Sequence, residues 1–337
     1  MPRILPLQGC VPVRELVLKG YGVRVQSRRG LLVVEGENGK LEVSPSELDQ
    51  VVVVSSGISL TSGAVRTLMR HGVDLIFLDE KGEPVGRLYP PYVNRTVLTR
   101  RRQYEAYLSE LRWLIVGAFV EAKIRNQANV LKYYAKSRGL DELKSCAAEL
   151  EVCLEKLPAA LGDPQRVMSV EAEAARAYWS GVAVLVPQRL GFEGRDPESL
   201  DPVNMCLNYC YRLLYSLCWR ALVLAGLDPY AGFLHADRSG KESLVYDYSE
   251  MFKPPAVDRM LLKLLSTGFE PQAENGLLTR DTRGQLVKAF REWVQRRVRP
   301  SSGEPCTLEQ AVKRWAFKLA SFLRGEEREY AGFIEPW

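Results

Sequence analysis

Two adjacent prolines, Pro90 and Pro91, separate a stretch of strand-like patterns from a longer stretch of helical patterns. Proline lacks the N–H that a strand ladder needs, and its fixed φ stiffens the chain, so this pair favours a linker. We therefore expect a first domain over residues 1–88, a proline-rich linker over 89–95 and a second domain over 96–337.

Short runs of branched apolar residues separated by glycine-containing turns occupy the first domain, which is typical of β-strands. The expected strands are Leu16–Leu18, Val23–Val25, Leu31–Val34, Leu41–Val43, Val51–Val54, Val73–Leu78 and Val85–Leu88. One helix is expected over about residues 61–71, because Gly72 follows where a helix commonly ends in the left-handed conformation. The first domain should therefore be β-rich.

From Thr96 onward, apolar residues recur at steps of three and four, which indicates amphipathic helices. The expected helical segments lie near residues 104–114, 120–134, 143–157, 201–225, 255–267, 280–299 and 307–324. Asp201 is a natural helix cap, and Pro202 suits the first helical position. The sequence thus predicts an α+β protein with a small β-rich N-terminal domain and a larger all-α domain.

Positive charge is concentrated near the start of the second domain. The chain has 46 Lys and Arg against 41 Asp and Glu, and residues 91–162 hold 12 of the former against 8 of the latter. Arg100, Arg101 and Arg102 lead this stretch, and a local basic stripe is the expected footprint of a phosphate-binding surface. A solvated helix face has the same composition, so the charge alone leaves both interpretations open.

Cysteine usage and the N-terminus bear on the cellular compartment. The seven cysteines include no C-x-x-C pair, and Cys206, Cys210 and Cys218 lie in an apolar helical pattern as small core residues. No signal-peptide pattern opens the chain, and no apolar run is long enough to cross a bilayer. We expect a cytoplasmic protein without a membrane partner.

Glu171 begins a stretch that is rich in alanine. On a helix, Ala174 and Ala175 lie on the same face as Glu171, and Tyr178 follows on that face two turns on. Small alanines let another element approach closely and leave Glu171 beside it. An alanine packing face with a solvent-exposed glutamate is the alternative.

His235 is one of only two histidines in the chain. The other, His71, precedes Gly72 at a helix end, where interaction with the helix dipole explains it. His235 follows an apolar run near a turn and has no such explanation, although a structural role is the alternative.

Asp247 and Glu250 are three residues apart, so they share a face if their segment is helical. They could form a carboxylate edge. Alternatively, Asp247 caps a helix and Glu250 completes a capping box, and the two roles can coexist.

Two carboxylates and one imidazole, with no thiolate, suit Mg²⁺ or Mn²⁺ better than a structural Zn²⁺. Such an ion could polarise a phosphodiester and orient an attacking hydroxyl, and a basic helical surface would supply affinity for DNA. Glu171, His235 and Glu250 are therefore the candidate metal ligands.

At these residues the sequence resembles the CRISPR-associated adaptation integrases, the family "Cas-one". The family's E-x-x-A-A-R-x-Y-[FW] helix is matched by Glu171–Trp179, and its G-L-D-P-Y-x-G-F-L-H-x-x-R motif by Gly226–Arg238. Further matches are Asp201–Tyr211, Ser243–Glu250, Val257–Arg259, Val73–Leu78 and the stretch from Leu323 to Tyr330. The resemblance spans nearly the whole chain.

The resemblance implies an N-terminal β-rich domain that serves dimerisation and an all-helical catalytic domain. It implies a metal-dependent DNA endonuclease and integrase that inserts short foreign DNA into a CRISPR array by attack of a 3′-hydroxyl on a phosphodiester. Glu171, His235 and Glu250 would hold the metal, with Asp247 as a supporting acid. DNA, a second copy of the chain and the small protein "Cas-two" would be its partners.

Departures from the family pattern are small: Ala172 stands where many members have glycine, and Glu250 where some have aspartate. The alternatives are a non-catalytic DNA-binding scaffold with this fold and an unrelated helical metal-dependent hydrolase. Further candidate DNA contacts, besides the three arginines above, are Tyr178, Arg238 and Arg259.

Overall fold

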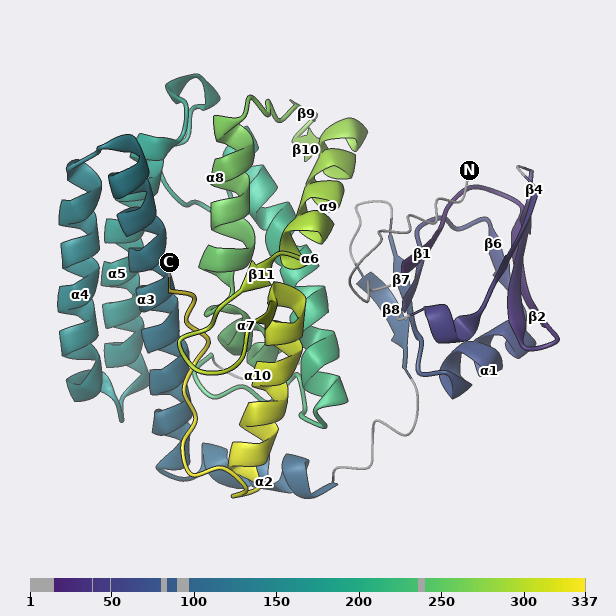
Figure 1. The fold of residues 1–337 in the computed structure, drawn as a ribbon, viewed down its shortest axis with the longest axis horizontal. Coiled ribbons are helices and arrows are strands. Elements are labelled where there is room, and N and C mark those ends of the chain that lie inside the picture. The colour runs from purple at the N-terminus through teal and green to yellow at the C-terminus, as the bar shows by residue number, and fades with distance from the viewer. Residues whose placement is uncertain are drawn as a thin grey trace. The chain divides into compact units, whose positions relative to one another are not determined.

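The structure is a computed structural model of the 337-residue chain. It describes residues 15–37, 39–48, 50–79, 84–89, 97–235 and 240–336. The chain divides into two compact units, residues 1–95 and 96–337 (Figure 1). Residues 90–95 of the expected linker lie outside the described residues.

Two four-stranded sheets form the first unit. One sheet has the order β1 (Glu15–Leu18), β5 (Gln50–Val53), β7 (Asp74–Leu78) and β8 (Pro84–Leu88). In this sheet β1, β5 and β7 are parallel, and β8 is antiparallel to β7. The other sheet has the order β4 (Gly39–Val43), β3 (Leu31–Gly36), β2 (Val23–Arg28) and β6 (Ile58–Leu60). Here β6 runs parallel to β2, and the remaining pairs are antiparallel.

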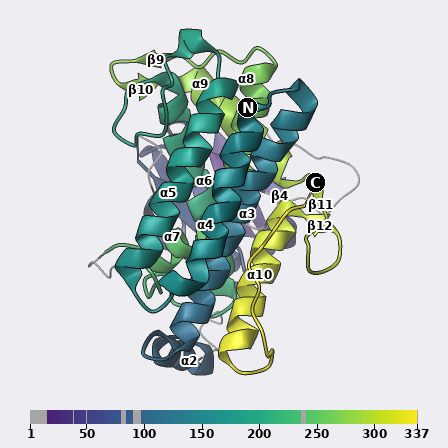
Figure 2. The same cartoon turned by 90° about the vertical axis from the view of Figure 1, so that its left-hand side faces the viewer.

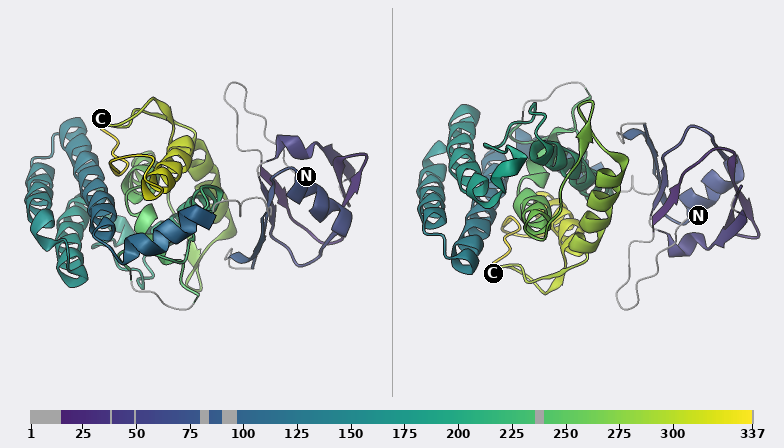
Figure 3. Two further views of the ribbon diagram at one scale, coloured as in Figure 1. Left: turned by 90° about the horizontal axis from the view of Figure 1, so that it is seen from below. Right: turned by 90° about the horizontal axis from the view of Figure 1, so that it is seen from above.

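The two sheets and helix α1 (Ser62–Arg70) enclose one apolar core, with α1 between the sheets (Figures 1 and 3). Its buried members are Leu16, Leu18, Val25, Leu32, Val34, Val51, Val53, Ala64, Leu68, Val73 and Leu75. Thr61 caps α1 by accepting from the Ala64 amide, and Gly72 follows the helix with a φ of +77°. The predicted β-rich first domain is confirmed.

Helices dominate the second unit. They are α2 (Val97–Tyr107), α3 (Leu111–Arg138), α4 (Glu142–Ala160), α5 (Pro164–Leu185), α6 (Pro202–Leu224), α7 (Ser243–Ser249), α8 (Arg259–Ser266), α9 (Arg280–Val294) and α10 (Leu308–Leu323). Helices α3, α4 and α5 run side by side (Figure 2). As predicted, Asp201 caps α6, accepting from the amides of Val203 and Asn204 at 3.0 and 2.9 Å. The predicted larger helical domain is confirmed.

Short elements also occur in each unit. They include the 3₁₀ turns η1 (Pro45–Glu47, in the first unit) and η3 (Gln188–Leu190), the π-helical turn η4 (Pro254–Asp258), and the ribbons β9 (Ala273–Glu274) with β10 (Leu277–Leu278) and β11 (Arg297–Val298) with β12 (Cys306–Thr307). The helix predicted over 280–299 is therefore too long: α9 ends at Val294, and Arg297–Val298 pair as a strand. Arg297 and Val298 pair with Thr307 and Cys306, a contact with a later segment that the helical period of residues 280–299 does not reveal.

The interior of the second unit is apolar and holds reduced cysteines. Cys206, Cys210 and Cys218 are buried and form no disulfide, as expected of small core residues. Burial raises the pKa of the Cys206 thiol to about 12, so this thiol stays protonated. None of the helices that the structure describes is both long and apolar enough to cross a bilayer.

Candidate active site

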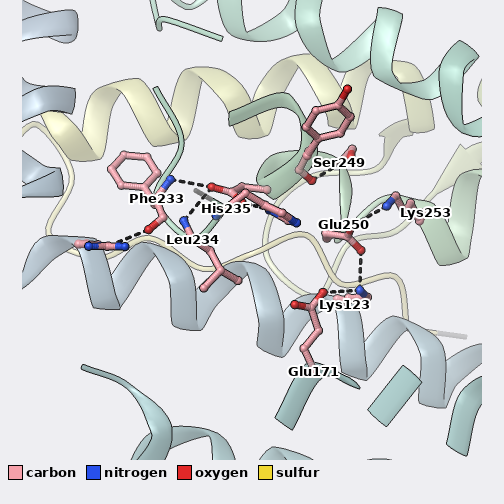
Figure 4. A network of polar contacts seen from close by, with 11 residues as sticks. Lys123, Glu171, Phe233, Leu234, His235, Ser249, Glu250 and Lys253 are labelled. Atoms are coloured by element: carbon pink, nitrogen blue, oxygen red, sulfur yellow. Dashed lines mark hydrogen bonds and ion pairs between the residues drawn. The ribbon is translucent and has the colours of Figure 1, made fainter. Parts of the chain in front are cut away.

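The three predicted metal ligands come from three separate elements of the second unit (Figure 4). Glu171 lies on α5, His235 lies in the segment that follows α6, and Glu250 comes directly after α7. All three side chains are largely enclosed, with exposed fractions of 15%, 30% and 12%. The fold therefore gathers residues that are far apart in the sequence into one partly buried region.

Lys123 of α3 joins two of these residues. Its ammonium donates to Glu171 Oε1 and forms an ion pair with Glu250 Oε2 at 2.6 Å (Figure 4). Burial disfavours the charge of Lys123, but the attraction of the two carboxylates outweighs it and raises the pKa of the lysine above its usual range. A positive charge is thus held between Glu171 and Glu250.

The Glu250 carboxylate is held by a second lysine, Lys253, which donates to its other oxygen. The Lys253 ammonium also lies over the rings of Tyr211 and Tyr215, 5.0 and 5.4 Å from their centroids. Burial by itself would raise the pKa of Glu250, but Lys123 and Lys253 lower it well below the usual range. Glu250 is therefore ionised despite its burial.

Asp247 orients His235. The Asp247 carboxylate accepts from the backbone amides of Phe233, Leu234 and His235 at 2.6, 2.9 and 3.1 Å, and also bonds the Nδ1 of His235. With Nδ1 engaged, the ring presents Nε2, and Figure 4 shows the ring pointing toward Glu250. The Asp247 bond, opposed by burial, raises the pKa of His235, with further contributions from Glu250 and Glu171.

Gly232 makes this arrangement possible. A Cβ at this position would lie 2.8 Å from Asp247 Oδ2 and 2.8 Å from the Cβ of Ser243. Such approaches are shorter than van der Waals contact, so a side chain here would push the loop away from the carboxylate. The glycine lets the backbone before His235 close onto Asp247.

The alternative in which Asp247 caps a helix is wrong. Asp247 lies inside α7, and the residue at the N-cap position is Glu242. The Asp247 carboxylate accepts instead from the amides of residues 233–235. These residues precede Asp247 by 12 to 14 positions, so the spacing of neighbouring residues does not reveal the contact. A long-range loop contact has replaced the expected local cap.

A buried aspartate links the elements behind the site. Asp258 in η4 accepts from the hydroxyl of Tyr178 on α5 at 2.9 Å and from that of Tyr211 on α6 at 2.7 Å. Burial raises the pKa of Asp258 from 3.8 to about 6, and the two tyrosine hydrogen bonds partly oppose this shift. Because Tyr178 shares α5 with Glu171, the network fixes the helix that carries a candidate ligand.

We predict that Asp258→Asn removes a pH-dependent loss of stability. The folded protein keeps a proton on Asp258 between pH 3.8 and about 6, where the unfolded chain releases it. This extra proton stabilises the folded protein by about 3 kcal/mol below pH 3.8, and the stabilisation is lost as the pH rises through 6. Urea unfolding of both proteins from pH 4 to 7 should show the wild type losing about 2 kcal/mol of unfolding free energy relative to Asp258→Asn. The exposed Glu149→Gln is the control, and a difference independent of pH contradicts the assignment.

The donor set fits a divalent cation, although no ready-made metal site is present. Within the described ranges, no three His, Cys, Asp or Glu side chains are grouped closely enough to hold an ion. Nevertheless, Glu171 and Glu250 already hold a positive charge between them, and His235 faces Glu250 with a free ring nitrogen. Carboxylate oxygens and an imidazole nitrogen are suitable ligands for Mg²⁺ or Mn²⁺.

The arginines that were predicted to contact phosphate lie on α2. Arg101 is exposed, and Arg102 forms an exposed ion pair with Glu105 at 2.7 Å. Arg100 is partly buried on the same helix. The phosphate-contact role of all three stays a prediction, and Arg238 lies outside the described residues.

Two other candidate DNA contacts have partners inside the fold. The Tyr178 side chain is fully buried, so the expectation that it touches DNA is corrected, and its hydroxyl belongs to the Asp258 network. The Arg259 guanidinium lies 4.9 Å from the centre of the Tyr133 ring and 3.4 Å from Glu335. These contacts hold Arg259 inside the fold, and its contact with DNA stays a prediction.

Sequence reasoning missed Lys123, Lys253 and Asp258. Lys253 could have been found, because it follows Glu250 by three residues and therefore shares a helical face with it. Lys123 gave no such signal, because it is one of the 12 Lys and Arg residues of the basic stretch 91–162. Its role depends on Glu171, which is 48 residues away in the sequence.

Known proteins resemble this chain along nearly its whole length. The family model described as CRISPR associated protein Cas1 matches residues 16–292. A CRISPR-associated endonuclease Cas1 from Saccharolobus solfataricus is 39% identical over 324 residues, which cover 96% of this chain and 98% of that protein.

Two solved structures share the fold. A casposase bound to its integration product has a TM-score of 0.78 at 24% identity and covers 94% of this chain and 92% of its own. A chain of a partial Cas6-RT-Cas1–Cas2 complex has a TM-score of 0.65 at 20% identity, over 95% of this chain and 97% of its own. With the family match and the 39% identical relative, these findings show that this chain belongs to the CRISPR-associated Cas1 family.

Proposed function

We propose that this protein is a divalent-metal-dependent DNA endonuclease and integrase that inserts short foreign DNA into a CRISPR array. One observation carries the proposal: Glu171 and Glu250, from separate elements, share one buried cation while His235 faces them. The endonuclease name of the 39% identical relative and the integration product bound to the casposase support the same chemistry.

The side chains of this site have separable roles in the proposed reaction. Glu171, Glu250 and Nε2 of His235 would hold Mg²⁺ or Mn²⁺. When bound, the ion would supply stabilisation of the charge that develops on the phosphodiester oxygens. Asp247 keeps His235 in the tautomer with its free nitrogen toward the site, and Lys253 keeps Glu250 ionised. The chain thereby holds the three candidate ligands in one largely enclosed region.

The partners that we propose are DNA, a second copy of the chain and the small protein Cas2. The fold shared with a chain of a Cas6-RT-Cas1–Cas2 complex supports the last of these. We assign dimerisation to the β-rich N-terminal unit. Light scattering of the full-length protein should give twice the 38.0 kDa chain mass, and a monomer at micromolar concentration contradicts this assignment.

A strand-transfer assay tests the proposed function. It combines the full-length protein, Cas2, a short DNA duplex and a plasmid that carries a CRISPR repeat, with Mn²⁺ or Mg²⁺. We expect covalent joining of duplex 3′ ends to the plasmid, abolished by EDTA and restored by excess metal. Joining that proceeds unchanged in EDTA rules out the metal-dependent mechanism. DNA binding without any joining favours the non-catalytic scaffold.

We predict that Arg101→Ala together with Arg102→Ala weakens DNA binding and flattens its salt dependence. Each lost phosphate contact should reduce the magnitude of the slope of log K against log salt by about 1, so the slope of the double variant should be less steep by about 2. Fluorescence anisotropy at several salt concentrations measures the slope. Arg125→Ala is the matched control, because Arg125 also forms an exposed ion pair on a helix, at 2.7 Å from Glu121. An unchanged slope assigns the arginines to a solvated face.

A further inference from the structure

Both oxygens of the Glu250 carboxylate are already bonded to lysines. Lys253 takes Oε1, and Lys123 takes Oε2 at 2.6 Å while also contacting Glu171. The place where a shared cation would bind both glutamates is thus the place that the Lys123 ammonium occupies. A divalent ion bound to these oxygens would lie within a few ångströms of Lys123, where like charges repel strongly in a partly buried site.

The net charge of these glutamates and lysines also indicates that Lys123 and a divalent ion exclude each other. Glu171 and Glu250 contribute two negative charges, and Lys123 and Lys253 contribute two positive ones, so the buried group is balanced. With the Asp247 carboxylate beside His235 also counted, addition of a divalent cation would leave one uncompensated positive charge in a region with little solvent. Departure of one lysine reduces this excess, and uncompensated buried charge is strongly unfavourable.

Lys123 is the lysine that can leave. Lys253 is confined over the rings of Tyr211 and Tyr215, whereas among the described residues the Lys123 ammonium pairs with the two glutamates. The two lysines are similarly enclosed, with 13% of the Lys123 side chain and 17% of the Lys253 side chain exposed, so the difference lies in their contacts. Lysine has four rotatable bonds, which allow the Lys123 ammonium to swing away from the carboxylates.

The backbone around Lys123 is firmly held, so the movement is confined to the side chain. One turn further along α3, Asn126 donates to the carbonyls of Met251 and Phe333, both at 2.7 Å. Its Oδ1 accepts from the amide of Glu335 at 2.9 Å. These buried bonds tie α3 to the residue that follows Glu250, and they keep the distance between the two elements constant while Lys123 changes rotamer.

We propose that Lys123 is an exchangeable internal cation that neutralises Glu171 and Glu250 and must be displaced for a divalent metal to bind. This inference rests on the metal site of the proposed function and adds a determinant of its affinity. Lys123 is a positioning residue: it keeps two buried carboxylates together, and it makes the metal compete with a covalently attached charge.

Mn²⁺ binding to the full-length protein tests the exchange by isothermal titration calorimetry. Lys123→Met should bind Mn²⁺ more tightly than the wild type, by roughly tenfold or more, because the competing charge is gone. Lys123→Arg keeps the charge and should bind no more tightly than the wild type. Lys132→Met is the matched control, since Lys132 lies on the same helix in an exposed ion pair with Glu151 at 2.6 Å. Unchanged or weaker binding by Lys123→Met overturns the inference.

Glu171→Gln separates this inference from the proposed function. If Glu171→Gln binds Mn²⁺ as the wild type does, the metal site itself is wrong. If Glu171→Gln weakens binding and Lys123→Met leaves it unchanged, the site stands and the exchange fails.

A labelling experiment on the wild type gives an answer even if Lys123→Met does not fold. Acetylation by an amine-reactive reagent, read by peptide mass spectrometry, should increase severalfold at Lys123 when Mn²⁺ saturates the protein. Labelling at Lys132 should not change. Protection of Lys123 that persists in saturating Mn²⁺ overturns the proposal.

Discussion

Replacement of His235 by alanine is expected to lower strand transfer by about a thousandfold, on the order of 4 kcal/mol of transition-state stabilisation. The variant loses the Nε2 that faces Glu250, and with it one of three proposed ligands. The fold should survive, because the Asp247 carboxylate still accepts three backbone amides and the His235 side chain is 30% exposed.

The other histidine of the chain supplies the matched control. His71 ends α1 in the first unit, where its Nδ1 lies 2.9 Å from the carbonyl of Thr67. His71→Ala should transfer strands at the wild-type rate. The measurement is the plasmid strand-transfer assay, with a thermal melt by circular dichroism to verify folding. More than a tenth of wild-type activity in folded His235→Ala would remove His235 from the metal site.

Asp247→Ala is expected to have the largest effect on stability, a loss of about 3–5 kcal/mol of unfolding free energy. The Asp247 side chain is 1% exposed, and its two oxygens accept three backbone amides in addition to the bond with His235. Its removal leaves buried N–H donors without acceptors, each costing about 1–3 kcal/mol. The loop before His235 should detach, and strand transfer should fall at least as far as in His235→Ala.

Urea denaturation measures the stability loss, and Asp141→Ala is the control because the Asp141 side chain is 87% exposed. The control should change the unfolding free energy by less than about 0.5 kcal/mol. Asp247→Asn should lose less unfolding free energy than Asp247→Ala but more than the control. Its amide oxygen remains as an acceptor, while its NH₂ group faces backbone donors. A loss below about 1 kcal/mol for Asp247→Ala would show that the loop keeps its conformation without this carboxylate.

The helix starts and strands were predictable where the signal is local. Asp201 and Pro202 begin α6 as expected, because a cap and a fixed φ act on the residues next to them. The apolar run Val51–Val54 matches β5, a strand with neighbours on both sides, because continuous burial leaves a continuous apolar pattern. Local rules failed at Asp247, where two acids three residues apart resembled a capping box.

In the candidate site too, the sequence revealed some residues and not others. Glu171, His235 and Glu250 could be proposed because their residue types suit a metal and their motifs resemble a known family. The partners that hold them could not be identified from spacing. Lys123 is 48 residues from Glu171, and Asp258 is 80 residues from Tyr178, so no local periodicity connects them.

By itself, the sequence determined that a strand-rich part precedes a larger helical part, and the helical or strand character of most segments. It also supplied the chemical types of the candidate ligands. Only the tertiary structure decided that a lysine stands between the two glutamates, that the Asp247 carboxylate binds the loop before His235 and that Tyr178 is buried. The physical reason is range: caps and periodicity act over a few residues, whereas charge pairing and burial depend on which distant segments pack together.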